Sequence, residues 1–256
     1  MALIEIRFDS QVLDLSLGMN VILPEHPDAW QTPPSVLYLL HGLSDDHTIW
    51  SRRTSIERYA ARYNLAVIMP DAYKSFYCNM AHGSDYFDFL AEELPSLVHR
   101  WFKVSEDPRN TFVAGLSMGG YGAMKLALAH PDRYAAAASI FGSLDLAAHV
   151  EEDWDDSRAR AFQAVFGDVG TVAGSDNDLI AQLHRMDSAP KTAFYLCVGT
   201  EDYLLADSIA FRDVAMAKGF NLTFEEEPGG HEWFFADRHI RRILEWLPIE
   251  RLARSE

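Results

Sequence analysis

The segment from Phe112 to His130 contains a serine whose neighbours suit a catalytic nucleophile. Gly115, Ser117 and Gly119 fit the pattern G-x-S-x-G, in which the serine lies on a sharp turn between a strand and a helix. The five residues alone are weak evidence, and a glycine-rich helix start that serves only packing is the alternative. Here, however, a buried-strand pattern precedes the serine and a helical pattern follows it. We therefore predict that Ser117 attacks a carbonyl carbon.

A serine hydroxyl needs a base that removes its proton before it can attack. His231 follows the run LTFEEEP, in a loop with two glycines that precedes a helical pattern. Because this is the end of the last predicted strand, His231 is expected at the same sheet edge as Ser117. Other histidines lie in loops, at helix ends or on predicted helix surfaces, namely His82, His130, His149, His184 and His239. We predict His231 as the general base.

An imidazole base needs a carboxylate on its other nitrogen, which fixes the tautomer and the ring orientation. Asp202 lies directly after the apolar run FYLCVG, which precedes the strand that leads to His231. The order Ser, Asp, His along the chain is the one found in α/β-hydrolases. Glu201 and Asp207 remain alternatives, although Asp207 is expected within a helix. We predict Asp202 as the acid.

A developing oxyanion needs backbone N–H donors from two directions. One donor is expected from Met118, because a helix start leaves its first N–H groups unpaired. The other is expected from Leu43, since His41 and Gly42 follow a buried strand and can turn the chain towards Ser117. An ordinary turn at the strand end is the alternative, and His41 itself is expected to be structural.

Aromatic residues near these loops could line a substrate pocket, although aromatic side chains more often serve packing. They are Trp50, Phe76, Tyr77 and Trp233.

Short, continuously apolar segments predict central strands that are covered on both faces. These segments are residues 35–40, 65–70, 110–115 and 191–199, with an alanine-rich candidate at 134–142. The opening residues 3–24 alternate between apolar and polar and predict two antiparallel strands. Helical patterns lie between the strands, at 51–63, 85–102, 118–130, 206–218 and 232–246.

This alternation predicts one α/β domain over residues 1–256, with a mostly parallel sheet between helices. The acidic stretch 145–187 interrupts the alternation and is expected to form short helices and loops. We interpret it as a lid-like or cap insertion that covers the site.

Composition narrows the classes of partner. The chain of 256 residues has 38 acidic and 22 basic residues, a formal net charge of −16. Such a charge repels nucleic acid and anionic membranes, and small neutral or cationic substrates are favoured. No apolar run is long enough to cross a bilayer. Residues 1–15 carry charges in place of the apolar core of a secretory signal, so a cytoplasmic location is expected.

The two cysteines do not predict a disulfide framework. Cys197 lies in an apolar run and is expected to be a core thiol, whereas no function is assigned to Cys78.

Several blocks along the chain resemble the short-chain carboxylesterases called tributyrin esterases, in the esterase D group of α/β-hydrolases. They occur in the order of that family and extend over almost the whole chain: VLYLLHGLSDDHTIW, LAVIMPDAYKSFYCN, TFVAGLSMGGYGAMKLAL, LCVGTEDYLL and GGHEWFF. The resemblance implies an α/β-hydrolase fold with a Ser117–Asp202–His231 triad. It also implies hydrolysis of short acyl esters without metal or cofactor, and assembly as a homodimer or homotetramer.

Related activities remain as alternatives. S-formylglutathione hydrolases of this group usually carry a Thr-Cys pair after the oxyanion turn, where this chain has GLSDDHTIW. Feruloyl and acetylxylan esterases share the fold but are often secreted and attached to carbohydrate modules, and the sequence indicates neither feature. Acyltransferases for long chains need an extended apolar groove, which the charges of 145–187 disfavour. A binding protein that has kept the fold without catalysis is the alternative from another class.

Overall fold

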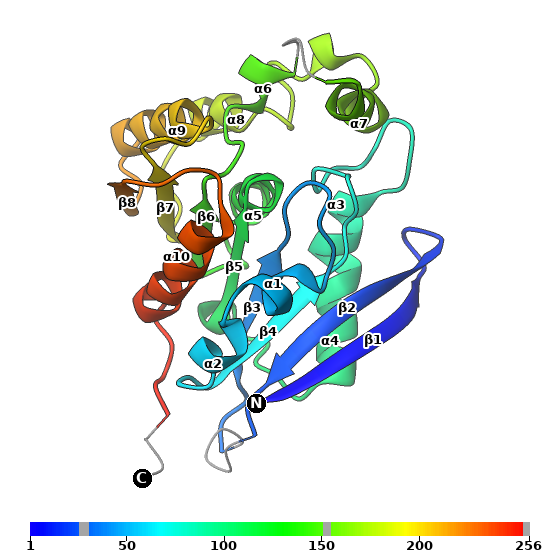
Figure 1. Cartoon of the computed structure of the whole chain (residues 1–256), viewed down its shortest axis with the longest axis vertical. Coiled ribbons are helices and arrows are strands. Elements are labelled where there is room, and N and C mark those ends of the chain that lie inside the picture. Colours follow the sequence, from blue (N-terminus) through cyan, green and yellow to red (C-terminus); the bar gives the residue numbers. More distant parts are fainter. Residues whose placement is uncertain (26–30, 151–154, 253–256) are drawn as a thin grey trace.

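The computed structural model describes residues 1–25, 31–150 and 155–252. In this part of the chain eight strands form one sheet in the order β1-β2-β4-β3-β5-β6-β7-β8 (Figure 1). Strands β3 to β8 run parallel, whereas β2 pairs antiparallel with both β1 and β4. The bounds are β1 (Ala2–Ser10), β2 (Leu15–Leu23), β3 (Ser35–Leu40), β4 (Leu65–Pro70), β5 (Thr111–Leu116), β6 (Ala136–Ile140), β7 (Ala193–Gly199) and β8 (Leu222–Glu227).

Helices cover both faces of the sheet and enclose two apolar cores. One face packs against α1 (Ile49–Arg53), α2 (Ile56–Ala60) and α10 (Trp233–Trp246). The other packs against α5 (Met118–Ala129), α9 (Leu205–Ala217) and a run made of α3 (Tyr86–Asp88), a π-helical turn (Phe89–Glu93) and α4 (Leu94–Trp101). The predicted α/β-hydrolase architecture, with a parallel sheet between helices and an antiparallel N-terminal hairpin, is confirmed.

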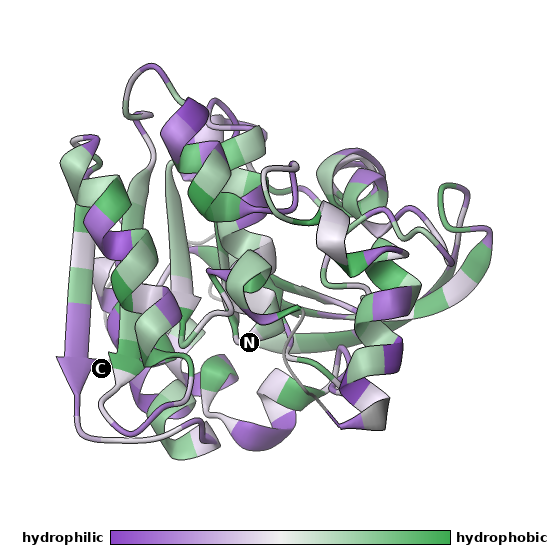
Figure 2. Cartoon of the chain, turned by 90° about the horizontal axis from the view of Figure 1, so that it is seen from above, coloured by the Kyte–Doolittle hydropathy of each residue, from purple (hydrophilic) through white to green (hydrophobic). Residues whose placement is uncertain are grey.

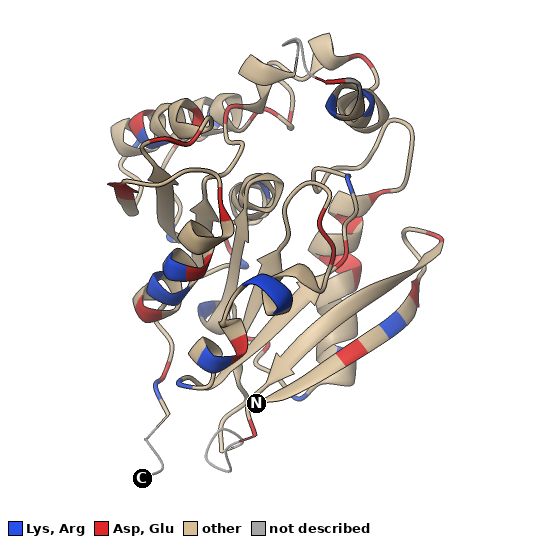
Figure 3. Ribbon diagram, in the orientation of Figure 1, with Lys and Arg blue, Asp and Glu red and all other residues tan. Residues whose placement is uncertain are grey.

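Burial explains the different sequence patterns of the strands. Every residue of β3 and β4 is buried, as expected for strands covered on both faces. In β1 burial alternates along the strand, because one side of this edge strand packs on the core while the other meets solvent. In Figure 2 the central strands are mainly hydrophobic, whereas the helices carry both hydrophobic and hydrophilic residues. Charged residues likewise lie mainly on helices and loops, and the central strands carry few (Figure 3).

The prediction of one helix over residues 51–63 is wrong, because the chain forms α1 and α2 with a break at Thr54. Thr54 has extended backbone angles of φ −131° and ψ 171°. Its hydroxyl donates to the carbonyl oxygen of Trp50 at 2.6 Å, and accepts from the N–H of Ile56 at 3.2 Å. Such local bonds by threonine compete with continued helix formation.

His239 is buried in α10, whereas the sequence pattern predicted a surface position. Its ring stacks on Phe235 with centroids 4.1 Å apart, and Nε2 lies 2.9 Å from a carboxylate oxygen of Glu227. The helix forms as its pattern predicted, but His239 faces the sheet because Glu227 of the edge strand β8 supplies a polar partner for the imidazole.

The segment 145–187 contains α6 (Leu146–His149), α7 (Asp156–Phe166), a 3₁₀ turn (Val169–Thr171) and α8 (Leu179–Arg185). These elements lie at the top of the molecule in Figure 1, beyond the loops that follow β5 and β7. Short helices are therefore observed here, as predicted. None of the helices in the described ranges is long and apolar enough to cross a membrane.

Candidate active site

Ser117 occupies a strained turn between β5 and α5. Its backbone angles are φ 53° and ψ −119°, a region that residues other than glycine rarely adopt. The turn is tight because β5 and the first turn of α5 nearly touch: a Cβ atom on Gly115 would lie 2.3 Å from the carbonyl oxygen of Gly119. Backbone strain of this kind collects at functional sites, where the surrounding packing maintains it.

The three residues predicted as a triad lie within hydrogen-bonding distance of one another. Nε2 of His231 is 3.0 Å from Oγ of Ser117, and Nδ1 is 3.0 Å from Oδ2 of Asp202. The Asp202 side chain is buried and also accepts a bond from the backbone N–H of Leu204 at 2.8 Å. Asp202 therefore faces the histidine as a fixed acceptor, and Nε2 faces the serine.

The alternative acids have other partners. The Glu201 carboxylate accepts bonds from the Thr200 hydroxyl and the backbone N–H of Gly229, and these bonds lower its pKa. It thereby fixes the start of the loop that carries His231. Asp207 lies in α9, where burial raises its pKa against the opposing effect of His149, whose Nε2 is 2.5 Å away. Neither carboxylate reaches the imidazole of His231.

Two backbone N–H groups lie beside Ser117. Met118 is the first residue of α5, and Leu43 follows β3; both line the same cavity as Ser117. In the part of the chain that the structure describes, neither N–H donates to a protein acceptor. The Gly42 carbonyl accepts from Nδ1 of His41 at 2.8 Å and from the N–H of Asp45 at 3.2 Å. Because the peptide is planar and trans, this holds the N–H of Leu43 on the opposite side.

His41 is itself held by buried polar neighbours. The backbone N–H of Ala72 donates to its Nε2 at 2.9 Å, which leaves the proton on Nδ1 for the Gly42 carbonyl. Its backbone oxygen accepts from the Tyr77 hydroxyl at 2.8 Å. Burial alone would raise the pKa of Asp71, but hydrogen bonds from the His47 side chain and from the backbone N–H of Tyr73 outweigh burial and lower it. The loop after β3 is thus anchored from several directions.

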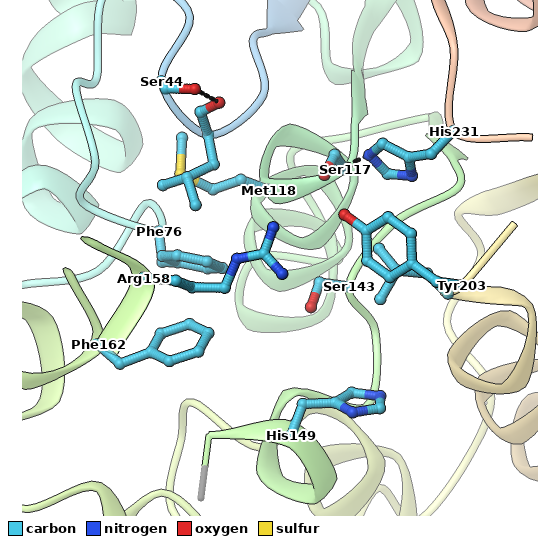
Figure 4. Close-up of a pocket in the computed structure, with 12 residues that line it drawn as sticks. Ser44, Phe76, Ser117, Met118, Ser143, His149, Arg158, Phe162, Tyr203 and His231 are labelled. Atoms are coloured by element: carbon cyan, nitrogen blue, oxygen red, sulfur yellow. Dashed lines mark hydrogen bonds between the residues drawn. The ribbon is translucent and has the colours of Figure 1, made fainter. Parts of the chain in front are cut away.

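A cavity of about 210 Å³ opens beside Ser117 (Figure 4). It is lined by Ser117, Met118 and His231, by other loop residues and by residues of the segment 145–187. The lining residues are Leu43, Ser44, Phe76, Ser117, Met118, Ser143, His149, Arg158, Phe162, Tyr203, Leu204 and His231.

Of the four aromatic residues predicted near the site, Phe76 lines the cavity. Trp50 is buried and donates through Nε1 to the carbonyl oxygen of Leu40, and its ring packs edge-on against Trp233. Tyr77 is buried, and its hydroxyl donates to the backbone oxygen of His41 in the loop after β3. These three belong to the packing around the loops and are not among the residues that line the cavity.

No sequence pattern indicated a site role for Tyr203, Arg158 or Phe162. His149 was predicted to have no catalytic role. All four line the cavity. Tyr203 directly follows Asp202, and its ring lies 4.7 Å from that of His231, so its position next to the acid was an available signal. The other three come from the segment 145–187, where short helices gave no indication of which face meets the site.

Within residues 1–25, 31–150 and 155–252, no group of three or more His, Cys, Asp or Glu side chains has a suitable arrangement to hold a metal ion. Cys78 and Cys197 are buried free thiols. The Nζ atom of Lys125 donates to Sγ of Cys78 at 2.9 Å.

The family of the chain follows from comparison with known sequences. The family model described as "Putative esterase" matches residues 10–234. The chain belongs to this esterase family. An acetyl esterase of Caldicellulosiruptor saccharolyticus is 29% identical over 263 residues, which cover 96% of this chain and 98% of the relative.

Solved structures agree with this family. The substrate-bound fluorophosphonate-binding serine hydrolase F (FphF) of Staphylococcus aureus has a TM-score of 0.89 and 33% identity, covering 96% of this chain and 98% of that one. An S-formylglutathione hydrolase (FrmB) of the same organism has a TM-score of 0.84 and 33% identity, with the same coverage. The chain is therefore a carboxylic ester hydrolase with the α/β-hydrolase fold, and a serine esterase.

Proposed function

We propose that this esterase hydrolyses short-chain acyl esters through an acyl-enzyme on Ser117. His231 takes the proton of the Ser117 hydroxyl as its oxygen attacks the ester carbonyl, and Asp202 stabilises the imidazolium that forms. The oxyanion lies between the N–H groups of Leu43 and Met118. Collapse of this intermediate breaks the ester bond, and His231 returns the proton to the leaving alcohol. Water, deprotonated by the same histidine, then releases the acid.

The observation that carries this proposal is the hydrogen-bonded chain from Ser117 through His231 to Asp202 at the floor of a cavity. The cavity volume of about 210 Å³ supports a small acyl group. It is comparable with the roughly 150 Å³ of an engineered apolar cavity that binds benzene. Short-chain specificity of the tributyrin esterase type is therefore part of the proposal.

Fluorophosphonate labelling and ester hydrolysis test the proposal together. The wild-type protein should be labelled at Ser117 and should hydrolyse p-nitrophenyl acetate and butyrate faster than long-chain esters. Ser117→Ala should lose the label and about 10³-fold or more of kcat. Labelling of the Ala variant at wild-type level, or a rate optimum at long chains, would overturn the nucleophile or the chain-length assignment respectively.

Thioester hydrolysis is a second candidate, because a structural neighbour at 33% identity is an S-formylglutathione hydrolase. The absence of the Thr-Cys pair from GLSDDHTIW favours oxygen esters. Comparing kcat/KM for S-formylglutathione with that for an acetyl ester on the same preparation decides between them. Adding an alcohol acceptor to the assay measures acyl transfer, which would divert the acyl group from water.

We also propose that the protein assembles as a homodimer or homotetramer, which rests on its resemblance to oligomeric esterases. Light scattering on the purified protein gives the mass, and a mass of one chain at micromolar concentration would contradict assembly.

A further inference from the structure

Two aromatic rings lie against the imidazole of His231. The centroid of the Phe141 ring is 4.3 Å from that of the imidazole, and the two planes are 46° apart. The Tyr203 ring, which Figure 4 shows beside His231, lies 4.7 Å from the imidazole at 38°. Phe141 follows β6 and Tyr203 follows β7, so two separate elements supply these contacts. The contacts leave the two ring nitrogens of His231 to their partners Ser117 and Asp202.

Phe141 is held in a strained backbone conformation. Its φ of 37° lies in the left-handed region, which residues other than glycine rarely adopt. Its N–H donates to the carbonyl oxygen of Cys197 at 2.7 Å, and the carbonyl oxygen of Ile140 accepts from the N–H of Ser117 at 3.0 Å. The bend after β6 is therefore bonded to β7 and to the nucleophile turn. Such strain persists where the surrounding structure fixes it, and it is concentrated at functional sites.

The two rings meet the imidazole in different environments. Phe141 is 2% exposed and also packs against Phe235 of α10, with the ring centroids 5.8 Å apart. It is not among the residues that line the cavity beside Ser117. Tyr203 lines that cavity and is 53% exposed. The contact of Phe141 is thus shielded from water, whereas Tyr203 covers the imidazole at the cavity surface.

We propose that Phe141 and Tyr203 are positioning residues that hold the His231 imidazole and stabilise the imidazolium that forms during catalysis. This rests on the proposed function, in which His231 takes the proton of Ser117. The face of an aromatic ring attracts a cation within roughly 6 Å of its centroid, and more strongly where water is excluded. The neutral imidazole lacks this charge, so the rings favour the protonated state. They therefore add to the effect of Asp202 on the same intermediate.

Replacing either ring by leucine leaves the charged groups around His231 in place. These groups are Asp202 at Nδ1, Glu201 at the start of the loop, Glu232 next in the chain, Asp45 beside Gly42, His149 of α6 and Arg158 of α7. Burial raises the pKa of Tyr203, so its hydroxyl is uncharged near neutral pH. Phe141→Leu and Tyr203→Leu thus each remove a ring without removing a charge.

The test is the pH dependence of kcat/KM for p-nitrophenyl butyrate. The acidic limb of this profile reports protonation of the base in the free enzyme. Because the imidazolium is less stable without a ring, the limb should move to lower pH by about 0.4 to 1.5 pH units in each leucine variant. In Phe141→Leu, kcat should also fall about 3- to 30-fold while KM changes little, since the cation forms on the way to the transition state.

Two control variants separate the aromatic faces from other effects. Tyr203→Phe keeps the ring without its hydroxyl and should leave the limb at the wild-type pH. Phe194→Leu removes a buried ring at the start of β7 that packs against Phe220, with centroids 5.2 Å apart, so it measures lost core packing alone. Its limb should also stay at the wild-type pH. Because Tyr203 is exposed, its leucine variant gives a readout even where Phe141→Leu does not fold.

The outcomes distinguish this inference from the proposed function. If wild-type protein hydrolyses the ester and the limbs of the folded leucine variants stay in place or move to higher pH, the inference is wrong while the esterase proposal stands. An equal shift in Phe194→Leu would also overturn it. A shift in one leucine variant alone assigns the effect to that ring and excludes the other. If folded wild-type protein neither hydrolyses short esters nor is labelled at Ser117, the proposed function fails.

Discussion

At the scale of single residues, the site depends on which carboxylate faces His231. Three acids occur within seven positions of the chain, and their environments differ. Glu201 is exposed and fixes a loop, Asp202 is buried against Nδ1 of His231, and Asp207 is paired with His149. In the proposed mechanism, only the arrangement of Asp202 can hold the imidazole tautomer that accepts the Ser117 proton.

Replacing these acids one at a time tests the assignment. Asp202→Asn should lower kcat by about 10⁴-fold, because the amide favours the wrong imidazole tautomer. Asp207→Asn should keep kcat within about tenfold of wild type, since its carboxylate does not contact His231. The measurement is kcat for a short acyl ester, with Glu201→Gln as a further control. Near-wild-type activity of Asp202→Asn together with loss in Asp207→Asn would show that the acid is misassigned.

At the scale of elements, the proposed mechanism requires the loop after β3 to present the N–H of Leu43, and not a carbonyl, to the oxyanion. His41 achieves this by donating to the Gly42 carbonyl while the Ala72 N–H satisfies its other nitrogen. His41 is not among the residues that line the cavity beside Ser117. We therefore propose it as a positioning residue for the oxyanion donor.

His41→Ala should lower kcat for a short acyl ester by about 10- to 100-fold, somewhat less than removal of an oxyanion donor. KM should change little, because the donor acts mainly on the transition state. The control is His184→Ala, which removes an exposed histidine of α8. A rise in KM at constant kcat would instead assign His41 to substrate binding.

The segment 145–187 also contributes to the site through whole elements. Its helix α7 contributes Arg158 and Phe162 to the cavity, and α6 contributes His149. The pairing of His149 with Asp207 ties α6 to α9. Substitutions on these helices are therefore expected to change substrate preference more than the chemical step.

At the scale of the whole molecule, the buried polar cluster around Asp71 links stability to pH. The pKa of Asp71 is lowered in the folded protein from its usual value of 3.8. Between the folded and unfolded pKa values, the unfolded chain binds a proton that the folded protein does not. Stability from Asp71 is thus fully present above about pH 4 and is lost as the pH falls below it.

Urea unfolding between pH 2.5 and pH 6 measures this contribution. The free energy of unfolding of the wild type should fall as the pH decreases below about 4. In Asp71→Asn this fall should be shallower and stability at neutral pH lower, because the neutral amide cannot replace the carboxylate that accepts from His47. Asp213→Asn, on an exposed position of α9, should keep the wild-type slope. Equal slopes in all three proteins would contradict the role of Asp71.

The sequence by itself determined the sheet, the strained serine turn and the candidate triad, because these depend on local patterns. Continuous apolar runs predict parallel strands, and parallel strands bring their carboxyl ends to one edge. Ser117 and Asp202 each follow such a run, and His231 follows the last predicted strand, LTFEEEP, so their proximity could be expected. The break at Thr54 was missed because a single hydroxyl bond outweighed the helical pattern there.

Only the tertiary structure decided which side chains surround the serine. Arg158 and His149 reach the cavity from a segment whose periodicity does not specify which way it faces. Tyr77 donates to the backbone oxygen of His41, in a loop that is remote from it in sequence. Such positions depend on how separate elements dock, and docking depends on contacts between residues far apart in the chain. For the same reason the structure, rather than the motif, distinguished Asp202 from Glu201 and Asp207 as the neighbour of His231.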